Sequence, residues 1–520
     1  MKILNLAGIV GVLLLAGRAF CAEEAPVQIA VNIHENGSKI DRHIFGQFAE
    51  HLGKGIYEGI WVGPGSSIPN TRGIRNDVVA ALRALHVPVV RWPGGCFADE
   101  YHWRKGIGDA VKRPATLNPN WGGVIEPNSF GTHEFFDFAQ QIDADAYLSI
   151  NVGSGSPQEA SEWLEYLTAD KASSLALERQ ANGRAAPFKV PFLGIGNESW
   201  GCGGTMTPEY YLSQLKIYSR YARNYDGRQK MQRIAVGPDS ADSSYLEAVM
   251  QAWQKKGWSW DMEGVSLHSY TVGKWPPTYK ATGFDEADYA SLIRDTLRME
   301  ELVRQHSATM DRYDPQKKVS LVVDEWGSWL APTPGSPVGF LEQQNSQRDA
   351  IIAALNINIF ARHADRVRMA NIAQMINVLQ AMILTDHERM VLTPTYHIFK
   401  MYVPFQDATF VPVEMKRENF QVGDISLPRL DAVAARSTSG QLWLAITNVD
   451  PARPARVELT DPAIKSAVGT ILTSPRSDSV NTFENATVVS PKPMTGQLSD
   501  HKVTLALPPH SVAVVALGLD

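Results

Sequence analysis

The sequence predicts an α/β protein: a (β/α)8 TIM barrel with a C-terminal β-sandwich of the jelly-roll-like kind. Between residues 41 and 404, eight short apolar runs alternate with amphipathic stretches of helical period. From residue 405 to 520 only short alternating runs remain, divided by Pro, Gly, Asn and Asp. Apolar strands that alternate with helices form a parallel sheet covered on both faces, whereas short alternating strands form sandwiches. A doubly wound open sheet is the alternative to the barrel.

The composition agrees with this class. The chain has 520 residues, of which 44% are hydrophobic and 20% charged, and its net charge is −6. These values are ordinary for a globular protein. They indicate neither a nucleic-acid surface nor a patch that binds anionic membranes.

Residues 1–22 have the pattern of a secretory signal peptide. Lys2 precedes an apolar run, and small residues lie around position 22, where we expect cleavage. The alternative, a transmembrane anchor, is disfavoured because the apolar run is too short to span a bilayer. We therefore expect an exported protein, periplasmic or extracellular, with no membrane partner.

Residues 23–40 have strand character. The run APVQIAVNIHENG alternates apolar and polar residues, as the C-terminal runs do. We expect this segment to join the β-sandwich, and the alternative is a lone strand that closes the bottom of the barrel.

Eight barrel strands follow in order. They are expected at residues 43–48, 87–92, 146–151, 191–196, 233–238, 264–269, 319–325 and 369–374. Helices are expected at residues 71–86, 132–144, 207–225 and 346–364, several of which begin with Ser, Thr or Thr-Pro. Eight units over this length exceed the roughly 250 residues of a typical barrel, so the loops must be long.

The sandwich strands complete the chain. They are expected within residues 435–450, 453–461, 466–474, 484–490, 501–508 and 510–520. No long helical period interrupts these runs, which favours two packed antiparallel sheets.

Polar side chains gather where the barrel strands end. Chemistry in such barrels takes place on the loops at the carboxyl ends of the strands. The residues there are Glu50, His51, Arg91, Asn151, Asn197, Glu198, His268, Tyr270, Glu325 and Gln374. This mixture of acids, amides and aromatic residues is what a polar substrate needs.

Two of these residues form a candidate catalytic pair. Glu198 ends the fourth strand and Glu325 the seventh, so the two carboxylates can flank a group bound at the barrel mouth. Carboxyl groups about 5–5.5 Å apart act by double displacement at a sugar carbon, whereas about 6.5–9.5 Å leaves room for water and gives inversion. Either acid alone could instead be the ion-pair partner of a loop arginine.

Several long motifs resemble those of the α-L-arabinofuranosidases of glycoside hydrolase family 51. They are FGQFAEHLGKGIYEGIW, RWPGGCFADEYHW, GIGNESWGCGG, SLHSYT, VVDEWGSW and MANIAQ. The resemblance extends from about residue 30 to the C-terminus. It implies a barrel with a C-terminal sandwich, a retaining mechanism, and no metal or organic cofactor.

The resemblance also implies roles for individual residues. Glu198 would be the acid/base and Glu325 the nucleophile. The implied substrate-binding residues are Glu50, Arg91, Asn197, His268, Tyr270, Gln374, Trp121 and Trp329. Among these, Arg91 would keep Glu325 ionised, Asn197 would reach the 2-hydroxyl, and the two tryptophans would contact the leaving group. A core histidine and ordinary aromatic packing are the alternatives for His268, Trp121 and Trp329.

The cysteines depart from the family pattern. Cys96 stands after PGG, where many members have Asn, and the WGCGG segment brings Cys202 close behind Glu198. We expect a disulfide between Cys96 and Cys202 that ties the second loop to the fourth, because exported proteins form disulfides. Two free thiols are the alternative.

These observations predict an exported, retaining exo-α-L-arabinofuranosidase. Its expected partner is an arabinose-containing oligo- or polysaccharide such as arabinoxylan or arabinan, and a homo-oligomer is possible. No zinc motif and no serine-nucleophile motif is found. The alternatives are a related hydrolase of a β-xyloside or β-glucan, and a catalytically silent sugar-binding protein.

Overall fold

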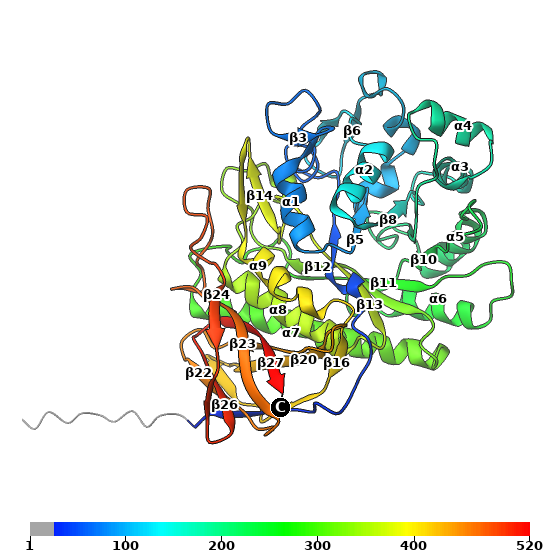
Figure 1. Ribbon diagram of the computed structural model, residues 1–520. Coiled ribbons are helices and arrows are strands. Elements are labelled where there is room, and N and C mark those ends of the chain that lie inside the picture. The colour runs from blue at the N-terminus through cyan, green and yellow to red at the C-terminus, as the bar shows by residue number, and fades with distance from the viewer. Residues whose placement is uncertain (1–24, 520) are drawn as a thin grey trace, which may run out of the picture.

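The computed structural model describes residues 25–519, which form a barrel and a sandwich packed against each other (Figure 1). The predicted signal peptide, residues 1–22, lies outside the described residues. Among those that are described, no helix has both the length and the apolar character that crossing a bilayer requires.

Eight parallel strands close into a barrel. In chain order they are β2 (Gly46–Phe48), β5 (Val89–Trp92), β8 (Asp145–Ile150), β9 (Phe192–Ile195), β10 (Gln232–Ala235), β11 (Gly264–Thr271), β12 (Ser320–Ser328) and β13 (Val367–Ile372). Each pairs with the next, and β13 pairs with β2 to close the circle. The predicted barrel is therefore confirmed, and the open-sheet alternative is wrong.

Strands β11 and β12 extend furthest toward the barrel mouth. They pair from Gly264 opposite Ser320 to Thr271 opposite Ser328, and this register sets His268 opposite Glu325. The barrel interior is filled by one inward side chain from each of six strands: Val89, Tyr147, Phe192, Ile234, Val322 and Met369. This packed interior leaves the strand ends as the place for a cavity.

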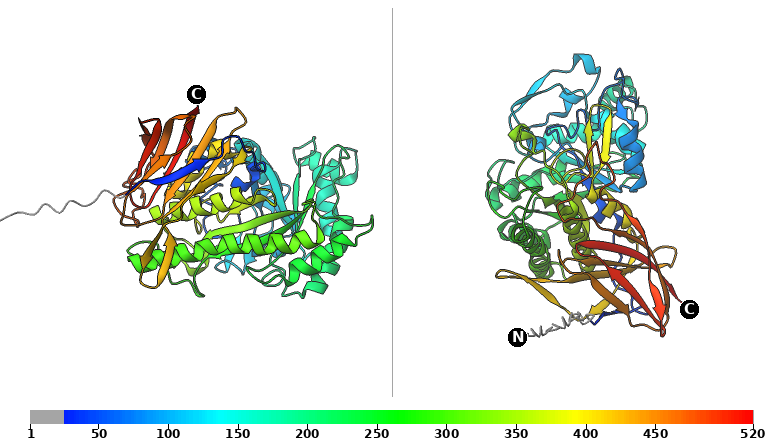
Figure 2. Two further views of the ribbon diagram at one scale, coloured as in Figure 1. Left: turned by 90° about the horizontal axis from the view of Figure 1, so that it is seen from below. Right: turned by 90° about the vertical axis from the view of Figure 1, so that its left-hand side faces the viewer.

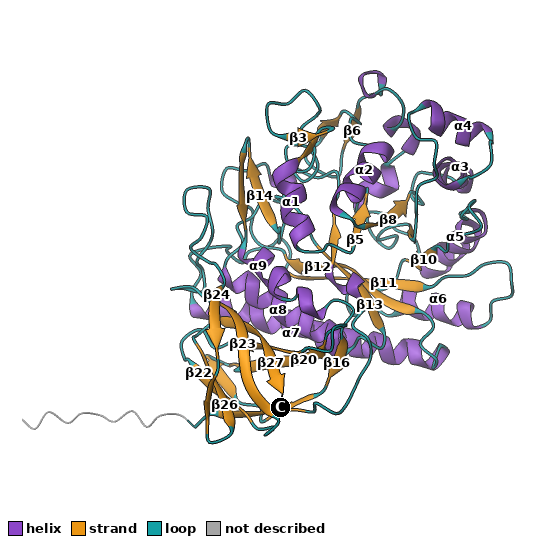
Figure 3. Cartoon of the chain, in the orientation of Figure 1, coloured by secondary structure: helices purple, strands orange, loops and turns teal. Residues whose placement is uncertain are grey.

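Helices surround the barrel (Figure 3). They are α1 (Asn76–Ala84), α2 (Thr132–Ile142), α3 (Pro157–Thr168), α4 (Ser174–Ala181), α5 (Pro208–Tyr221), α6 (Ser244–Gln254), α7 (Glu286–Tyr313), α8 (Gln347–Arg362) and α9 (Pro394–Met401). Helices α3, α5 and α9 begin with Pro after a Ser or Thr whose side chain accepts a backbone N–H, the combination expected at a helix start.

One predicted helix is too long at its start. Residues 71–75 belong to a small hairpin of β3 (Asn70–Thr71) and β4 (Ile74–Arg75) that precedes α1. Gly73 makes the turn with φ +89°, a conformation that a helix cannot include.

Helix α8 joins the two halves of the molecule. It contacts β12 and β13 of the barrel on one side and β20, β21 and β27 of the sandwich on the other. Residues 347–361 are all buried. The contact between barrel and sandwich is therefore part of the hydrophobic core rather than a loose hinge.

The sandwich consists of two sheets. The order of one is β17-β1-β22-β26-β25, and that of the other is β16-β20-β21-β27-β23-β24. Their strands are β1 (Val27–Val31), β16 (Thr409–Val411), β17 (Val413–Met415), β20 (Leu430–Arg436), β21 (Leu442–Asn448), β22 (Ala455–Leu459), β23 (Ile464–Leu472), β24 (Lys492–Thr495), β25 (Gln497–Ser499), β26 (Lys502–Leu507) and β27 (Ser511–Leu519).

The N-terminal strand β1 lies inside the first of these sheets. It pairs antiparallel with β17 and parallel with β22, and it runs among the C-terminal strands in Figure 2. Its side chains Val27, Ile29 and Val31 are buried in the sandwich core. The alternative of a strand that closes the barrel bottom is wrong.

One predicted sandwich strand is absent. Residues 484–490 form a loop that the side chain of Asn481 holds in place. Asn481 accepts the N–H of Val489 at 2.8 Å and donates to its carbonyl oxygen at 2.9 Å. The backbone groups of Val489 are thus bonded by an amide side chain rather than by a neighbouring strand, and β24 is the edge strand of the sheet.

The remaining elements are short. Three more hairpins are formed by β6 (Thr116–Asn118) with β7 (Val124–Glu126), β14 (Ile383–Asp386) with β15 (Arg389–Leu392), and β18 (Asn419–Val422) with β19 (Ile425–Pro428). Short 3-10 helices span Arg42–Phe45, Cys96–Glu100, Trp103–Gly106, Ala110–Lys112, Val338–Phe340 and Val403–Phe405.

Candidate active site

A cavity of about 370 Å³ opens at the carboxyl ends of the barrel strands. Nine of the ten predicted catalytic and binding residues line it: Glu50, Trp121, Asn197, Glu198, His268, Tyr270, Glu325, Trp329 and Gln374. They come from five strand ends and one hairpin, so the barrel brings together residues that are up to 324 positions apart in the chain.

The buried side chain of Asp99 holds the backbone of the segment that carries Glu198. Asp99 accepts the N–H of Asn197 at 3.0 Å, and its other oxygen accepts the N–H groups of Val152 and Gly153 at 2.8 Å each. One side chain thereby joins the loops after β5, β8 and β9. Burial raises the pKa of Asp99 to about 7, although the three N–H donors favour the carboxylate.

Glu325 has two donors, one for each carboxylate oxygen. Arg91 Nη1 donates to Oε1 at 2.7 Å, and the Tyr270 hydroxyl donates to Oε2 at 2.7 Å. Burial opposes ionisation, but the charges of His268 and Arg91 and the Tyr270 hydrogen bond outweigh it, so the pKa of Glu325 is lowered. This carboxyl is therefore held ionised.

Glu198 has the opposite tendency. Burial, together with the charge of Glu325, raises its pKa, although a hydrogen bond with His268 opposes this. His268 Nδ1 lies 2.8 Å from Glu198 Oε1 and 3.5 Å from Glu325 Oε1, so the imidazole stands between the two acids. One oxygen of each acid and a nitrogen of His268 all lie within 4.8 Å of one another.

Arg91 does not line the cavity, which corrects its placement among substrate-contacting residues. It is 1% exposed and lies beneath the wall, where Nη2 donates to Asn197 Oδ1 at 2.6 Å while Nη1 holds Glu325. Its Nε lies 3.7 Å from Asp324 Oδ2. The guanidinium therefore orients two wall residues rather than a ligand, because both of its Nη atoms already donate to them.

Glu50 lies at the closed side of the cavity. Its Oε1 accepts the Trp121 indole N–H at 2.8 Å and the N–H of Phe97 at 3.0 Å, and its Oε2 accepts Gln374 Nε2 at 3.2 Å. Burial raises its pKa to about 7. A Cβ at Gly95 would lie 2.5 Å from Glu50 Oε1, so the glycine of the PGG motif is required for this close approach.

Two strand-end residues named in the sequence turn away from the cavity. His51 lies 2.8 Å from Glu126 through Nδ1 and accepts the Trp92 indole N–H at Nε2, at 3.1 Å. Asn151 accepts the N–H groups of Ser154 and Gly155 and so shapes its own loop. Both are buried polar residues whose role is structural.

The sequence analysis did not name several residues of the cavity wall, among them Trp200, Asp239, Ser240 and Trp275. Asp239 directly follows the segment 233–238, so the strand-end rule that found the other acids would have found it as well. Trp275 lies after β11 and is 63% exposed, with its ring 4.7 Å from that of Trp329. A tryptophan in a Gly- and Pro-containing loop that follows a strand end was the signal available in the sequence.

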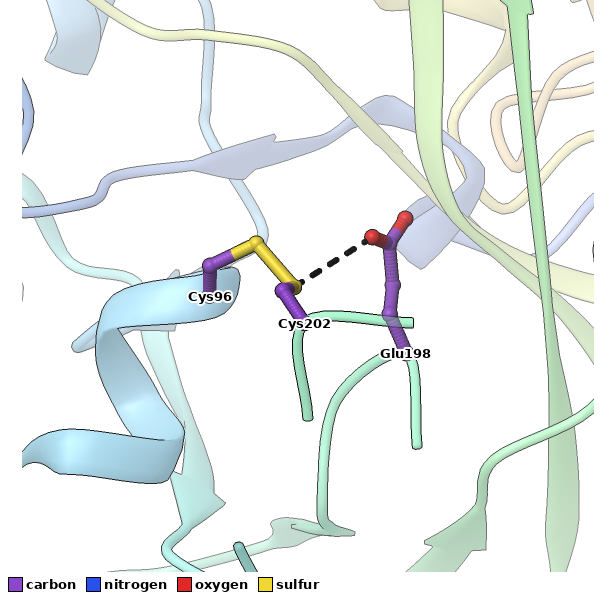
Figure 4. A group of neighbouring side chains, drawn as sticks. All are labelled: Cys96, Glu198 and Cys202. Carbon is purple, nitrogen blue, oxygen red and sulfur yellow. Dashed lines mark hydrogen bonds between the residues drawn. A yellow bond between two sulfur atoms is a disulfide. The ribbon is translucent and has the colours of Figure 1, made fainter. Parts of the chain in front are cut away.

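Cys96 and Cys202 form a disulfide beside the cavity (Figure 4). It connects the 3-10 helix Cys96–Glu100, which follows β5, with the loop after β9, as the family departure led us to expect. The free-thiol alternative does not describe the structure.

Among the residues that the structure describes, two side-chain groups have the spacing of metal ligands, and both include Glu198. In one, the partners are Cys96 and Cys202, whose sulfur atoms are bonded to each other and offer no thiolate. In the other, the donors of His268 and Glu325 already hold hydrogen bonds with protein groups. We assign a metal to neither group.

Comparison with known proteins gives consistent matches. Residues 81–275 match the family described as "Alpha-L-arabinofuranosidase 1 domain" and residues 324–511 the "Alpha-L-arabinofuranosidase C-terminal domain". An "Intracellular exo-alpha-L-arabinofuranosidase" of Bacteroides ovatus is 43% identical over 97% of this chain and 99% of its own length.

Solved structures agree. The GH51 arabinofuranosidase of Xanthomonas axonopodis pv. citri superposes with a TM-score of 0.92 at 49% identity, covering 95% of this chain and 99% of that one. An arabinose complex of the Thermotoga maritima α-L-arabinofuranosidase gives a TM-score of 0.83 at 30% identity, covering 95% and 100%.

Proposed function

This chain belongs to the α-L-arabinofuranosidases of glycoside hydrolase family 51, and from that premise we propose that it is an exported exo-enzyme that releases terminal L-arabinofuranose with retention. The observation that carries the mechanism is the pair of acids. An oxygen of Glu198 and one of Glu325 lie within 4.8 Å, which favours the short carboxyl separation of double displacement over the wider one of an inverting enzyme.

In the first step Glu325 is the nucleophile and Glu198 the acid. Ionised Glu325 attacks the anomeric carbon while the proton of Glu198 moves to the leaving oxygen, and the glycosidic bond breaks. The assignment follows from the opposite pKa directions, because the acid must start protonated and the nucleophile ionised.

In the second step the roles change. The sugar ester on Glu325 removes the negative charge that had raised the pKa of Glu198. Glu198 therefore ionises more readily and accepts a proton from the water that attacks the ester. Each such proton transfer is worth roughly 10²–10⁴-fold in rate.

The cavity supports recognition of a single terminal sugar. Glu50 and Gln374 line the cavity with oxygen and nitrogen atoms, and we assign Asn197, which lines it next to Glu198, to the 2-hydroxyl. Hydrogen bonds to that hydroxyl contribute most when they tighten in the transition state. Arg91 donates a hydrogen bond to each of Asn197 and Glu325 and so holds the two side chains in a constant relative position.

The leaving group would lie among tryptophans. Trp121, Trp329 and Trp275 line the cavity, and aromatic faces suit the apolar faces of sugar rings. We therefore assign arabinoxylan- or arabinan-type oligosaccharides as the substrate class.

Export is supported by two features. The apolar leader at residues 1–22 has the pattern of a signal peptide, and the Cys96–Cys202 disulfide is of a kind that persists in oxidising compartments. The Bacteroides ovatus relative is described as intracellular. Fractionation of cells that express the full chain tests export: a shortened N-terminus in the periplasm or medium is expected, and full-length protein confined to the cytoplasm would contradict it.

The function is tested by proton NMR of the first product from 4-nitrophenyl α-L-arabinofuranoside. We expect the α-anomer to appear first, no comparable turnover of the 4-nitrophenyl β-xylopyranoside, and loss of activity in Glu325→Ala. The exposed Glu35→Ala is the matched control and should retain activity. The β-anomer as first product would overturn double displacement, and preference for the xyloside would overturn the substrate class.

A further inference from the structure

The disulfide places a sulfur atom against the proposed catalytic acid. Cys202 Sγ lies 3.5 Å from Glu198 Oε2, the oxygen that His268 does not contact (Figure 4). Asn197 Nδ2 lies 3.7 Å from the same sulfur. The sulfur therefore faces the side of the carboxyl that is free to deliver a proton.

The oxidation state of this sulfur decides which partner carries the hydrogen. A disulfide sulfur has no proton and is a weak acceptor, so a hydrogen bond between it and Glu198 exists only while the carboxyl is protonated. A thiol, in contrast, has an S–H that can donate to the ionised carboxylate. A hydrogen bond to the neutral form raises a pKa, and one to the charged form lowers it.

We propose that the Cys96–Cys202 disulfide is a positioning group for the general acid, holding a proton-free sulfur against Glu198 so that the carboxyl keeps its proton until the leaving group takes it. The proposal rests on the proposed role of Glu198 as the acid. Reduction would remove this effect: a small dithiol gives two electrons and two protons, the S–S bond breaks, Cys96 and Cys202 become thiols, and the dithiol becomes a cyclic disulfide.

The other groups around Glu198 do not change with the disulfide. Those that titrate or carry charge are His268 and Tyr270 on β11, Glu325 on β12, Arg91 on β5, Glu50 after β2 and Asp239 after β10. A difference between oxidised and reduced forms in the titration of Glu198 therefore reports on the sulfur or on the loops that it ties together.

Two variants separate these causes. Cys96→Ala breaks the link and leaves Cys202 as a thiol donor, whereas Cys96→Ala/Cys202→Ala breaks the same link and leaves no donor. The measurement is the pH profile of kcat/KM on an arabino-oligosaccharide, whose poor leaving group needs the acid. The basic limb of the profile reports the pKa of Glu198. We expect this limb in Cys96→Ala to lie about 0.5–1 pH unit below that of the double variant, because one net hydrogen bond from the thiol to the carboxylate lowers the pKa by that amount.

Several outcomes would overturn the proposal. Coincident basic limbs in the two variants would show that only loop tethering matters, and alkylation of two thiols in the native protein would remove the disulfide itself. If the variants fold poorly, wild-type enzyme is compared with and without dithiothreitol; reduction is expected to move the basic limb to lower pH, and an unmoved limb overturns the proposal. Failure of wild-type enzyme to cleave any arabinofuranoside would instead refute the proposed function, so the two failures are distinguishable.

Discussion

Two glutamates of the cavity wall with opposite pKa directions set the chemistry at the scale of single residues. Glu325 is buried and Glu198 half-buried, and only Glu325 has a guanidinium and a hydroxyl donating to its oxygens. Within residues 25–519, the one hydrogen bond of this strength to the Glu198 carboxyl comes from His268, and Glu325 repels its charge. The division between acid and nucleophile thus follows from neighbours rather than from residue type.

Substitution of Arg91 should show that its charge lowers the pKa of Glu325. Arg91→Gln takes a cation from beneath Glu325, so the pKa of Glu325 should rise and the acidic limb of kcat/KM should move to higher pH. Arg91→Lys keeps the charge but cannot hold Glu325 and Asn197 together, so we expect an unmoved limb and a loss of about 10²-fold from misplacement.

The pH profiles of both variants on the 4-nitrophenyl substrate provide the measurement, with thermal melts to show that they fold. The exposed Arg298→Lys on α7 is the control. An acidic limb that stays in place in Arg91→Gln would refute the role given to the guanidinium.

At the scale of elements, loops rather than strands determine the cavity. Asp99 joins the loops after β5, β8 and β9, and the Cys96–Cys202 disulfide joins two of these a second time. The hairpin of β6 and β7 brings Trp121 to the Glu50 carboxylate. The long barrel loops expected from the sequence therefore serve to position the acids.

Asp99→Asn should loosen this arrangement. The amide keeps one acceptor oxygen but sets an N–H group against the N–H of Asn197 or of the β8 loop, which should cost about 1–3 kcal/mol of unfolding free energy. The exposed Asp424→Asn, between β18 and β19, is the control and should cost little.

The cost should also depend on pH. The folded-state pKa of Asp99 is raised to about 7, so its contribution to stability is fully present below its unfolded pKa near 4 and is lost as pH rises through about 7. The uncharged Asn has no such loss, so the gap between wild type and variant should narrow from pH 5 to pH 8. Urea unfolding at several pH values measures it, and a gap that widens with pH would contradict the raised pKa.

Trp275 tests the leaving-group side of the cavity. Its exposed ring packs edge-on against Trp329, which in turn packs against Tyr270. Trp275→Ala should lower kcat/KM on an arabinoxylo-oligosaccharide about 3- to 10-fold, the worth of one aromatic contact, and leave the short 4-nitrophenyl substrate nearly unchanged. Trp258→Ala, an exposed tryptophan outside the cavity wall, is the control, and equal losses on both substrates would refute the assignment.

At the scale of the whole molecule, the barrel and the sandwich are joined by a buried interface. Helix α8 is buried between them, and β1, which precedes the barrel in the chain, lies within the sandwich. The first and last strands that the structure describes, β1 and β27, thus lie in the two sheets of the sandwich, and the barrel strands come between them in the chain. We expect the two parts to unfold together.

A substitution at Ile29 tests whether the barrel and the sandwich unfold together. Its side chain is fully buried in the sandwich core, so Ile29→Ala should cost about 2–5 kcal/mol of unfolding free energy. Gln28→Ala, on the exposed face of the same strand, should cost little. Loss of activity on heating should follow the same shifted transition as circular dichroism, whereas activity that outlasts the sandwich would show that the barrel folds on its own.

The local patterns of the sequence predicted most of the fold and the two acids of the candidate site. Apolar runs of strand length, helix starts and turn residues depend on neighbours in the chain, so they marked all eight barrel strands and the sandwich. The rule that polar residues at strand ends meet at one mouth then selected Glu198 and Glu325. The same local reasoning extended a helix over residues 71–75 and placed a strand at 484–490, where Gly73 and Asn481 decided otherwise.

The amino-acid sequence by itself determined the barrel, the sandwich and the two acids with most of their surroundings, because these follow from periodicity and order along the chain. Only the tertiary structure decided the distance between the acids, the position of Arg91 beneath the wall, the partners of β1, and the place of Trp275. Each of these depends on contacts between distant segments, such as Arg91 with Glu325 at a separation of 234 residues. Such contacts are fixed by the closure of the barrel and not by any local pattern.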